Sequence, residues 1–466
     1  MDATPTTSPF WSARPAPSLM HAQLLRRPPL ATSASGLTIH LEGRGAITDA
    51  TGGATAATIG HGNAEVLAAV TAQMQQLSYC HTLCYTTAAA EALADRLVAG
   101  AGAGFADGGR AYLVCSGSEA VDSAMKLARQ RFYEAGEPRR THFIARRQAY
   151  HGNTLGAMSL TAAPARVEPY RDIFLPAVSH VAPCYAYQYR RPAETDAAYV
   201  ARLAEELDAE FRRVGPERVV AFVGETVSGS VAGCVPPVDG YWRAMKAVCE
   251  RHGALLILDE VMCGMGRTGS MFAWQREGVV PDITTVGKGL GGGYIPIAAV
   301  LAQGHVMDVL ERGSGNVVQS YTFQAHAVAS AAALAVQNIV QRDGLIENSA
   351  RMGVVLEELL RSALAEKRFV GDIRGRGCFY AVEFVKDRST KESLDPALKF
   401  AYMLAERALD MGVHLYPMSG TVDGKRGDHI LLAPAITVTE EQLRGIVGVV
   451  KAAYDEVEAE VLRMHC

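Results

Sequence analysis

Three side chains near the ends of apolar runs have the chemistry of acid–base and covalent catalysis. Asp259 and Glu260 come immediately after the run Leu255–Leu258, and Lys288 stands between two glycines after the run Ile283–Val286. Ligands of open α/β sheets bind beyond the carboxyl ends of strands, which suits these positions to a ligand site. By themselves the two acids would more readily be interpreted as caps of the following turn. The flanking glycines leave room for a bulky group near the lysine backbone, which a surface lysine rarely needs.

The segment Val114–Ala120 joins the end of an apolar run to the start of an amphipathic stretch through small residues, Ser116, Gly117 and Ser118. Backbone N–H groups at a helix N-terminus bind phosphate, and small side chains let the anion approach. Ser118 could equally be an ordinary helix N-cap. The segment is therefore a candidate phosphate site that needs support from other residues.

One cofactor requires all three of these features together, namely pyridoxal phosphate. Its phosphate favours a helix N-terminus, its ring nitrogen needs a carboxylate, and its aldehyde needs a lysine with which to form a Schiff base. Tyr150 follows the run His142–Ala145 and offers an aromatic ring for stacking, although it could equally belong to the core. The residues therefore predict a pyridoxal phosphate site that includes Lys288, Asp259 and Ser116–Ser118.

Short apolar runs alternate with longer amphipathic stretches over most of the chain. This alternation favours an α/β domain with a largely parallel sheet, covered by helices on both faces. The predicted strands are Ala111–Cys115, His142–Ala145, Val219–Gly224, Ala254–Leu258, Ile283–Val286 and Ile297–Leu301. The predicted helices are Glu119–Glu134, Ala197–Arg213 and Tyr241–Arg251.

The pattern changes after about residue 341, where longer helices and shorter strands predict a smaller α+β domain. The predicted elements there are helices Leu345–Ala365 and Pro396–Leu409, strands Tyr380–Phe384 and His429–Leu432, and a final helix from Glu440. Whether the strand-like Leu37–Glu42 and the glycine-rich Thr51–Gly62 pack with this domain is left open by the sequence. We divide the chain into a disordered lead-in (1–17), an N-terminal part of the small domain (18–70), a large cofactor-binding domain (71–340) and a C-terminal small domain (341–466).

Composition excludes several classes of partner. The 466 residues carry 45 basic and 49 acidic side chains, a formal charge of −4, which argues against nucleic acid as a partner. No apolar run approaches the length of a membrane-spanning helix, and no secretory signal is evident. The start of the chain resembles a transit peptide only weakly, and nine scattered cysteines favour a reduced compartment, so we expect a cytoplasmic protein. Cys80, His81 and Cys84 lack a second pair at zinc-like spacing, so we expect no metal site.

The whole chain resembles the class III (subgroup II) pyridoxal-phosphate-dependent aminotransferases, in particular their ω-aminotransferase-like members. The resemblance depends on an ordered set of motifs, each weak by itself, that runs from about Ser18 to near the C-terminus. The motifs are Ser116–Ala120, Tyr150–Gly152, Gly224–Val227, Leu258–Val261, Gly264–Gly269, Pro281–Ile283, Gly287–Gly293 and Arg374–Gly377.

This resemblance implies a fold of the aspartate-aminotransferase type (fold type I), with a large, mostly parallel sheet domain and a small α+β domain built from both chain ends. It implies that Lys288 forms the aldimine with pyridoxal phosphate and moves the proton in a ping-pong transamination, and that Asp259 pairs with the ring nitrogen. The remaining cofactor contacts that it implies are Ser116, Gly117, Ser118, Tyr150, His151, Glu225, Val261 and, across the interface of a homodimer with shared active sites, Thr322. Pairing of dimers into tetramers stays open.

Several residues depart from the family pattern. Met262 replaces a glutamine that many members place near the ring hydroxyl, and Tyr321 is bulkier than usual before Thr322, which we expect to narrow the substrate entrance. Ser230 replaces a glutamate that pairs with the family's carboxylate-binding arginine. Arg374 matches that arginine but lacks this gating partner. This favours an amine or ω-amino acid as donor and pyruvate as acceptor, with 2-oxoglutarate not excluded.

Arg426 is a second candidate for the substrate carboxylate, because relatives carry a mobile arginine in a comparable loop. A solvated turn is the alternative reading of that loop.

Three functional readings remain open from the sequence. The first is a transaminase that uses an amine or (ω-)amino acid and a 2-oxo acid. The second is a decarboxylating transaminase or an aminomutase, since Lys288 and Asp259 would serve those reactions as well. The third is a non-catalytic scaffold dimer, which the retention of both residues argues against. Gly287-x-Gly289-x-x-Gly292 matches a dinucleotide-binding fingerprint, but the following glycines and Pro296 are incompatible with the helix that this fingerprint requires.

Overall fold

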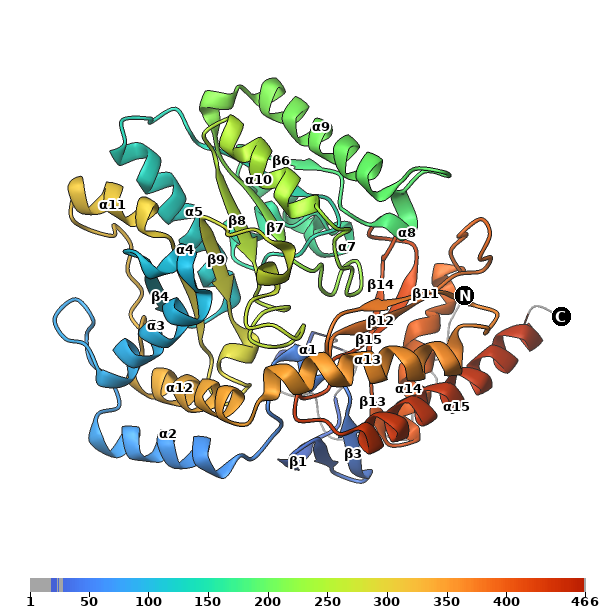
Figure 1. The fold of residues 1–466 in the computed structure, drawn as a ribbon. Coiled ribbons are helices and arrows are strands. Elements are labelled where there is room, and N and C mark those ends of the chain that lie inside the picture. The colour runs from blue at the N-terminus through green and yellow to red at the C-terminus, as the bar shows by residue number, and fades with distance from the viewer. Residues whose placement is uncertain (1–17, 23, 25–27, 465–466) are drawn as a thin grey trace.

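The computed structural model describes residues 18–22, 24 and 28–464, and the lead-in predicted for residues 1–17 lies outside the described residues. The chain forms three sheets surrounded by helices (Figure 1). The largest has seven strands in the order β4-β10-β9-β8-β7-β5-β6. Its strands are β4 (Arg110–Val114), β5 (His142–Arg146), β6 (Val178–Val181), β7 (Val219–Glu225), β8 (Leu255–Asp259), β9 (Ile283–Val286) and β10 (Ala298–Ala302).

The large sheet is mostly parallel, as the alternating pattern predicted. Strands β6, β5, β7, β8 and β9 pair in parallel, whereas β10 is antiparallel to both of its neighbours, β9 and β4. All seven residues of β7 and all five of β8 are buried, because helices cover both faces of the sheet. The carboxyl ends of β7 and β8 therefore meet at one edge, with Glu225 paired to Asp259 in the register.

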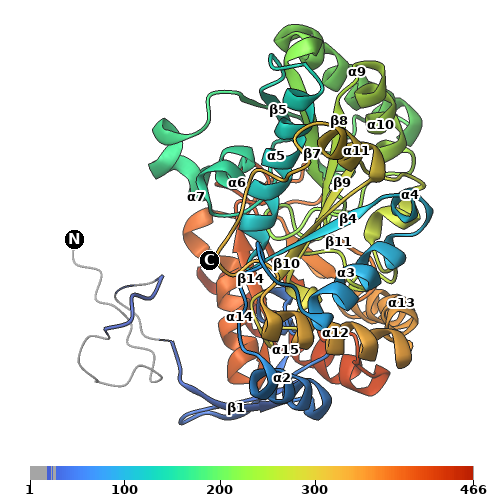
Figure 2. The same ribbon diagram turned by 90° about the vertical axis from the view of Figure 1, so that its left-hand side faces the viewer.

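Two apolar clusters fill the two faces of this sheet. One contains side chains of α5 (Gly117–Glu134), α6 (Leu155–Leu160) and α11 (Gly304–Arg312). The other contains side chains of α3 (Ala88–Ala101), α9 (Asp196–Val214), α10 (Tyr241–Arg251) and α12 (Ala327–Arg342). Figure 2 shows α6 and α10 on opposite sides of the strands. The short helices α4 (Ala103–Ala106), α7 (Pro164–Val167) and α8 (Ala186–Tyr189) lie in the connections.

One of the two smaller sheets joins both ends of the chain, and the other is built from C-terminal strands alone. In the first, β1 (Ala31–Ser35), β2 (Thr38–Leu41) and β3 (Gly45–Asp49) are antiparallel, and β13 (Val413–His414) pairs in parallel with β3. The second is antiparallel, in the order β11 (Val370–Gly375), β12 (Tyr380–Phe384), β15 (Asp428–Leu432) and β14 (Tyr416–Ser419). The pairing of β3 with β13 settles the question that the sequence left open, because it ties the N-terminal strands to the C-terminal region.

A third apolar cluster lies beneath these sheets and the helices that cover them. It contains residues of α13 (Leu345–Leu364), α14 (Phe400–Asp410) and α15 (Glu440–Met464), together with β11, β12 and β15. Helices α1 (Gly52–Thr55) and α2 (Ala64–Gln76) connect the N-terminal strands to the large sheet. In Figure 1 the orange and red C-terminal elements and the blue N-terminal strands lie together, beside the large sheet.

Most of the elements that the sequence patterns predicted lie within one or two residues of their observed bounds. The predicted strands Ile283–Val286 and Tyr380–Phe384 and the helix Tyr241–Arg251 have the predicted bounds. The patterns did not predict strands β1, β3, β6, β11, β13 and β14 or helices α2, α3, α11 and α12. In β6 and β11, polar residues interrupt the short apolar runs. The helix predicted over Pro396–Leu409 begins later, at Phe400, after a 3₁₀ turn at Pro396–Leu398.

Candidate active site

One cavity lies where strands of the large sheet end on their carboxyl side. β7 ends at Glu225, β8 ends at Asp259 and Lys288 follows β9, and all three residues line the cavity. The other lining residues are Gly117, Ser118, Tyr150, His151, Gly152, Val227, Ser230, Val261, Met262 and Cys263. The sheet therefore brings to one place the residues that the sequence has after separate strands.

The Asp259 carboxylate is held by three hydrogen bonds. The Val261 backbone N–H donates to Oδ1 at 3.0 Å and the Thr285 hydroxyl donates to the same oxygen at 3.3 Å. The His151 imidazole contacts Oδ2 through Nδ1 at 2.8 Å, and its side chain is fully buried. These contacts fix the position of the carboxylate from three separate elements of the fold.

Lys288 begins a 3₁₀ turn with a backbone φ of 40°, in the left-handed region that residues other than glycine seldom adopt. Burial lowers the pKa of its ammonium group, and the charge of Arg166 acts in the same direction, whereas Asp259 and Glu225 oppose this shift. The pKa shift favours the neutral amine, which is the nucleophilic form.

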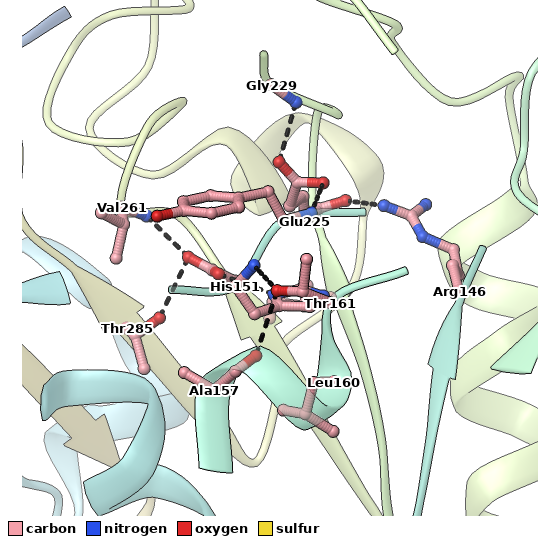
Figure 3. Close-up of polar contacts among 12 residues, drawn as sticks. Arg146, His151, Ala157, Leu160, Thr161, Glu225, Gly229, Val261 and Thr285 are labelled. Atoms are coloured by element: carbon pink, nitrogen blue, oxygen red, sulfur yellow. Dashed lines mark hydrogen bonds and ion pairs between the residues drawn. The ribbon is translucent and has the colours of Figure 1, made fainter. Parts of the chain in front are cut away.

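Glu225 is buried at the end of β7 and faces the same cavity. Burial raises the pKa of its carboxyl group above the ordinary value. Oε1 accepts the Gly229 backbone N–H at 2.8 Å, and the Tyr150 backbone N–H contacts Oε2 at 3.4 Å. Arg146 donates to the Glu225 backbone carbonyl at 2.5 Å, so the strand end is fixed as well as the side chain (Figure 3).

The N-terminus of α5 faces the cavity through Gly117 and Ser118. Ser116, rather than Ser118, is the N-cap: its hydroxyl oxygen accepts the Glu119 backbone N–H at 3.2 Å. The Ser118 hydroxyl oxygen instead accepts the backbone N–H of Asn153 at 2.9 Å, which joins the helix start to the Tyr150–Gly152 loop.

Gly117 is required by the close approach of Val261. A Cβ atom on Gly117 would lie 2.6 Å from Val261 Cγ1, a distance that side chains do not tolerate. The backbone at the helix start is therefore open to a ligand on one side and packed against Val261 on the other. Small residues with free N–H groups at this point suit a phosphate group.

Thr322 and Tyr321 lie outside the residues that line this cavity. Thr322 is exposed, and its carbonyl oxygen accepts a hydrogen bond from the Tyr79 hydroxyl at 3.0 Å. The Tyr321 hydroxyl accepts a hydrogen bond from the Lys126 ammonium at 2.9 Å on α5. A narrowing of the substrate entrance by Tyr321 stays a prediction, since within one chain it contacts α5 rather than the cavity.

Arg374 lacks the gating glutamate, since Ser230 occupies that position, but it has two other acidic partners. Its guanidinium is buried and pairs with Glu383 at 2.5 Å and with Asp372 at 3.0 Å. Its remaining donors bind the backbone carbonyls of Ala232 at 2.6 Å and Gly233 at 2.7 Å. The carboxylates come from β11 and β12, which the sequence near Ser230 could not indicate.

Arg426 lies in the turn between β14 and β15 and does not line the cavity. Its Nε donates to Asp423 at 2.7 Å, and its side chain is 63% exposed. The loop is fixed to the large sheet region through other atoms: the Gln148 side chain donates to the Thr421 and Val422 carbonyls at 2.7 and 2.5 Å. In this conformation Arg426 is a solvated turn residue.

Sequence reasoning missed Thr285 and Arg146 as supports of the site. Thr285 reaches Asp259 because β9 pairs with β8, with these two residues opposite each other in the register. Arg146 ends β5 and reaches the backbone of the neighbouring strand β7. Neither has a signal in the linear sequence, because both contacts depend on which strands are neighbours in the sheet.

Within the described ranges, no group of three or more metal-ligating side chains gathers. Cys84 Sγ lies 3.8 Å from His81 Nδ1 in an exposed loop. Over the same ranges, none of the helices combines the length with the hydropathy that a membrane span requires.

The cavity therefore combines a nucleophilic amine, two carboxylates, an aromatic ring and a helix N-terminus. This donor set fits pyridoxal phosphate: Gly117 and Ser118 lie at the anion-binding helix start, and Asp259 and Lys288 supply the carboxylate and the amine that the cofactor needs.

Comparison with known proteins identifies the family. The model of the family described as Aminotransferase class-III matches residues 26–454. An uncharacterized aminotransferase of Schizosaccharomyces pombe is 45% identical over 447 residues, which are 96% of this chain and 97% of the relative. A diaminobutyrate–2-oxoglutarate transaminase of Halomonas elongata is 34% identical over 86% of this chain and 84% of its own.

A solved amine transaminase from an uncultivated Pseudomonas species, in a pyridoxal-phosphate-bound form, has the same fold. It superposes with a TM-score of 0.86 at 31% identity, over 97% of this chain and 99% of that structure. The predicted fold type and the predicted family are confirmed. The chain belongs to the class III aminotransferases, a family of pyridoxal-phosphate-dependent transaminases.

Proposed function

We propose that this protein moves an amino group from an amine or an (ω-)amino acid to a 2-oxo acid, either pyruvate or 2-oxoglutarate, with pyridoxal phosphate as cofactor. The observation that carries this proposal is the convergence of Lys288 and Asp259 on one cavity at the strand ends. The names of the relatives support both an amine donor and a 2-oxo acid acceptor.

The residues of the cavity would divide the work of holding the cofactor. Ser116, Gly117 and Ser118 would bind the phosphate at the start of α5, with Tyr150 and Val261 on the two sides of the ring. When bound, the cofactor supplies an electron sink that stabilises negative charge on the substrate carbon.

Two side chains would carry the chemistry itself. Asp259, fixed by His151, Val261 and Thr285, would hold the proton on the ring nitrogen. Lys288 Nζ would bind the aldehyde and, once released by the substrate amine, move a proton at the substrate carbon. The lowered pKa of Lys288 supports both roles, because a neutral amine is needed to attack and to accept a proton.

Two residues, Ser230 and Arg374, favour pyruvate over 2-oxoglutarate as the acceptor. Ser230 lines the cavity where a gating glutamate stands in relatives that alternate between two carboxylate substrates, and Arg374 is already paired with Glu383. A site without that gating glutamate suits a donor that has no second carboxylate for the site to bind.

We further propose that the protein acts as a homodimer in which Thr322 reaches the partner's cofactor. An exposed apolar surface next to Thr322 supports this, since such surfaces commonly mark interfaces. The surface consists of Tyr79, Leu83, Tyr85, Val318 and Phe323. Tyr79 connects the segment 79–85 to the segment 318–323. Its hydroxyl donates to the Thr322 carbonyl, and its ring centroid lies 5.9 Å from that of Phe323.

Absorbance spectroscopy tests the proposed reaction directly. Protein mixed with pyridoxal phosphate should show a visible-range band of lysine-bound cofactor, and an effective amine donor should bleach that band. Pyruvate or 2-oxoglutarate should then restore it, which identifies the acceptor. A protein that binds the cofactor yet releases carbon dioxide from the donor would instead be a decarboxylating relative, and a protein that binds none would be a scaffold.

Light scattering after size-exclusion chromatography tests the dimer. Phe323→Glu should shift the mass from two chains to one, whereas Val354→Glu, at an exposed position of α13, should not. A wild-type mass of one chain would contradict the dimer.

A further inference from the structure

The charge of the cavity leaves a substrate carboxylate without a partner. Glu225 and Asp259 are acidic, and Lys288 is the only lysine or arginine among the described residues that line it. Lys288 would be engaged with the cofactor aldehyde. An amino acid or a 2-oxo acid therefore needs a second cation close to this cavity.

The two arginines that the sequence singles out do not meet this need. The Arg374 guanidinium is buried and binds two carboxylates and two backbone carbonyls, so that each of its three nitrogens is engaged. Arg426 is largely exposed and pairs with Asp423 of its own turn.

Arg166 lies on α7 beside the cavity. Its guanidinium carbon is 4.6 Å from the centroid of the Tyr150 ring, and Tyr150 lines the cavity. Its Nη2 approaches the Met418 sulfur of β14 at 3.7 Å, which is a weak acceptor. The side chain thus lies at the rim between the large sheet and the C-terminal sheet, half-buried. It is near enough to Lys288 for its charge to help lower the pKa of that residue, after the larger effect of burial.

Among the described residues, Arg166 differs from the nearby arginines in having no carboxylate partner. Among the residues that the structure describes, none with a carboxylate forms an ion pair with it, whereas nearby Arg147 pairs with Glu206 at 3.1 Å and Arg171 pairs with Glu168 at 3.0 Å. A guanidinium presents five N–H donors in a planar fork that matches a carboxylate. Within the part of the chain that the structure describes, the contact with sulfur is the only hydrogen bond that this fork donates.

The surroundings of Arg166 would strengthen a bond to a carboxylate. The face of Tyr150 and the thioether of Met418 are weak partners that orient the guanidinium without neutralising it. A charge pair formed in a half-buried position gains more than one formed in open solvent. Release of these weak contacts would cost little when a carboxylate arrives.

We propose that Arg166 binds the carboxylate of the amino acid and 2-oxo acid substrates and so determines specificity for them. This inference rests on the transaminase function proposed above. Arg166 is then a residue that touches substrate, while Arg374 supports the fold.

Paired substrates with and without a carboxylate test this proposal. In the holoenzyme, Arg166→Gln should raise the concentration of L-alanine or pyruvate needed for half-maximal cofactor conversion about 10- to 100-fold. The half-maximal concentration of benzylamine should change less than about two-fold, since benzylamine has no carboxylate that needs a cationic partner. Arg166→Lys should fall between, because it keeps the charge and loses the fork. Arg171→Gln, on the adjacent exposed segment, is the matched control and should match the wild type with all three compounds.

A second readout does not need turnover. Calorimetric titration of the holoenzyme with propanoate, an unreactive carboxylate, should show binding to the wild type and a loss of at least about ten-fold in Arg166→Gln. Equal binding to both proteins, or none to the wild type, would overturn the role of Arg166, as would an equal loss for benzylamine and L-alanine. A wild type that converts neither compound but binds propanoate through Arg166 would overturn the proposed reaction and leave the carboxylate site standing.

Discussion

The imidazole Nδ1 of His151 lies 2.8 Å from Oδ2 of Asp259, although 108 positions separate the two residues in the chain. Both side chains are buried, and His151 Nε2 has no hydrogen-bond partner among the described residues. The imidazole therefore acts on the carboxylate alone, as a donor that orients it toward the cavity.

His151 should accordingly be a positioning residue for Asp259. We expect His151→Ala to retain the cofactor but to slow the conversion of bound cofactor by an amine about 10- to 100-fold, because one of three donors that fix the carboxylate is lost. His151→Asn should recover part of that rate, since its amide can replace Nδ1–H. Stopped-flow absorbance measures both rates. A purely structural role would instead lower the melting temperature without a separation between the two variants.

Lys288→Ala should abolish the band of lysine-bound cofactor and all turnover while leaving the melting temperature near that of the wild type. The reason is that Lys288 supplies the only amine among the described residues of the cavity. Lys386→Ala removes an exposed lysine that pairs with Glu392 at 2.7 Å, and is the control that should keep full activity. Turnover in Lys288→Ala comparable to the control would refute the assignment.

Gly117→Ala should weaken cofactor binding at least about ten-fold. The new Cβ would lie 2.6 Å from Val261 Cγ1, and overpacking of this kind typically costs about 1–3 kcal/mol. Gly445→Ala on α15, where a Cβ meets nothing within 4 Å, should leave cofactor affinity unchanged and stabilise the helix by about 0.5–1 kcal/mol. Fluorescence titration of each apoprotein with pyridoxal phosphate compares the affinities. Unaltered affinity in Gly117→Ala would mean that Val261 can move at no cost.

Glu260 should make stability depend on pH near neutrality. It is fully buried, and burial raises the pKa of its carboxyl group to about 7, even though the Ala273 and Trp274 N–H groups donate to it at 2.7 Å. Between its ordinary value and about 7, the folded state holds a proton that the unfolded state has released. Stability is therefore greatest below the ordinary value and falls as pH rises through about 7.

The contribution of Glu260 to the pH dependence of stability is the difference between the melting curves of the wild type and Glu260→Gln. Melting temperatures from pH 5 to 8 should fall more steeply for the wild type, by an amount equivalent to at most about 3 kcal/mol. Glu441→Gln, at an exposed position of α15, should follow the wild type. Parallel curves for wild type and Glu260→Gln would show that Glu260 keeps the same charge throughout this range.

Arg374 should contribute mainly to stability. Arg374→Ala leaves Glu383 buried without a cation, which typically costs about 3–5 kcal/mol. Adding Glu383→Gln should recover part of that loss, since the unpaired charge is removed. Arg444→Ala breaks an exposed pair with Glu440 and should cost at most about 1 kcal/mol. Urea denaturation measures all four proteins. An unchanged midpoint in Arg374→Ala, together with weaker binding of carboxylate substrates, would return Arg374 to the substrate site.

The sequence by itself determined the chemical groups and their positions at strand ends. Asp259, Lys288 and the Ser116–Ser118 turn follow locally encoded apolar runs, and a parallel sheet necessarily gathers the carboxyl ends of its strands. For that reason the cofactor and the family could be predicted from local patterns and their order.

The tertiary structure alone decided which groups act on one another. Thr285 contacts Asp259 because β9 lies beside β8, and Arg374 pairs with Glu383 because β11 and β12 form an antiparallel pair. Arg166 of α7 faces the Tyr150 ring, although α6 lies between the two residues in the sequence. Such contacts depend on strand order and side-chain packing between distant segments, and local sequence patterns do not encode either one.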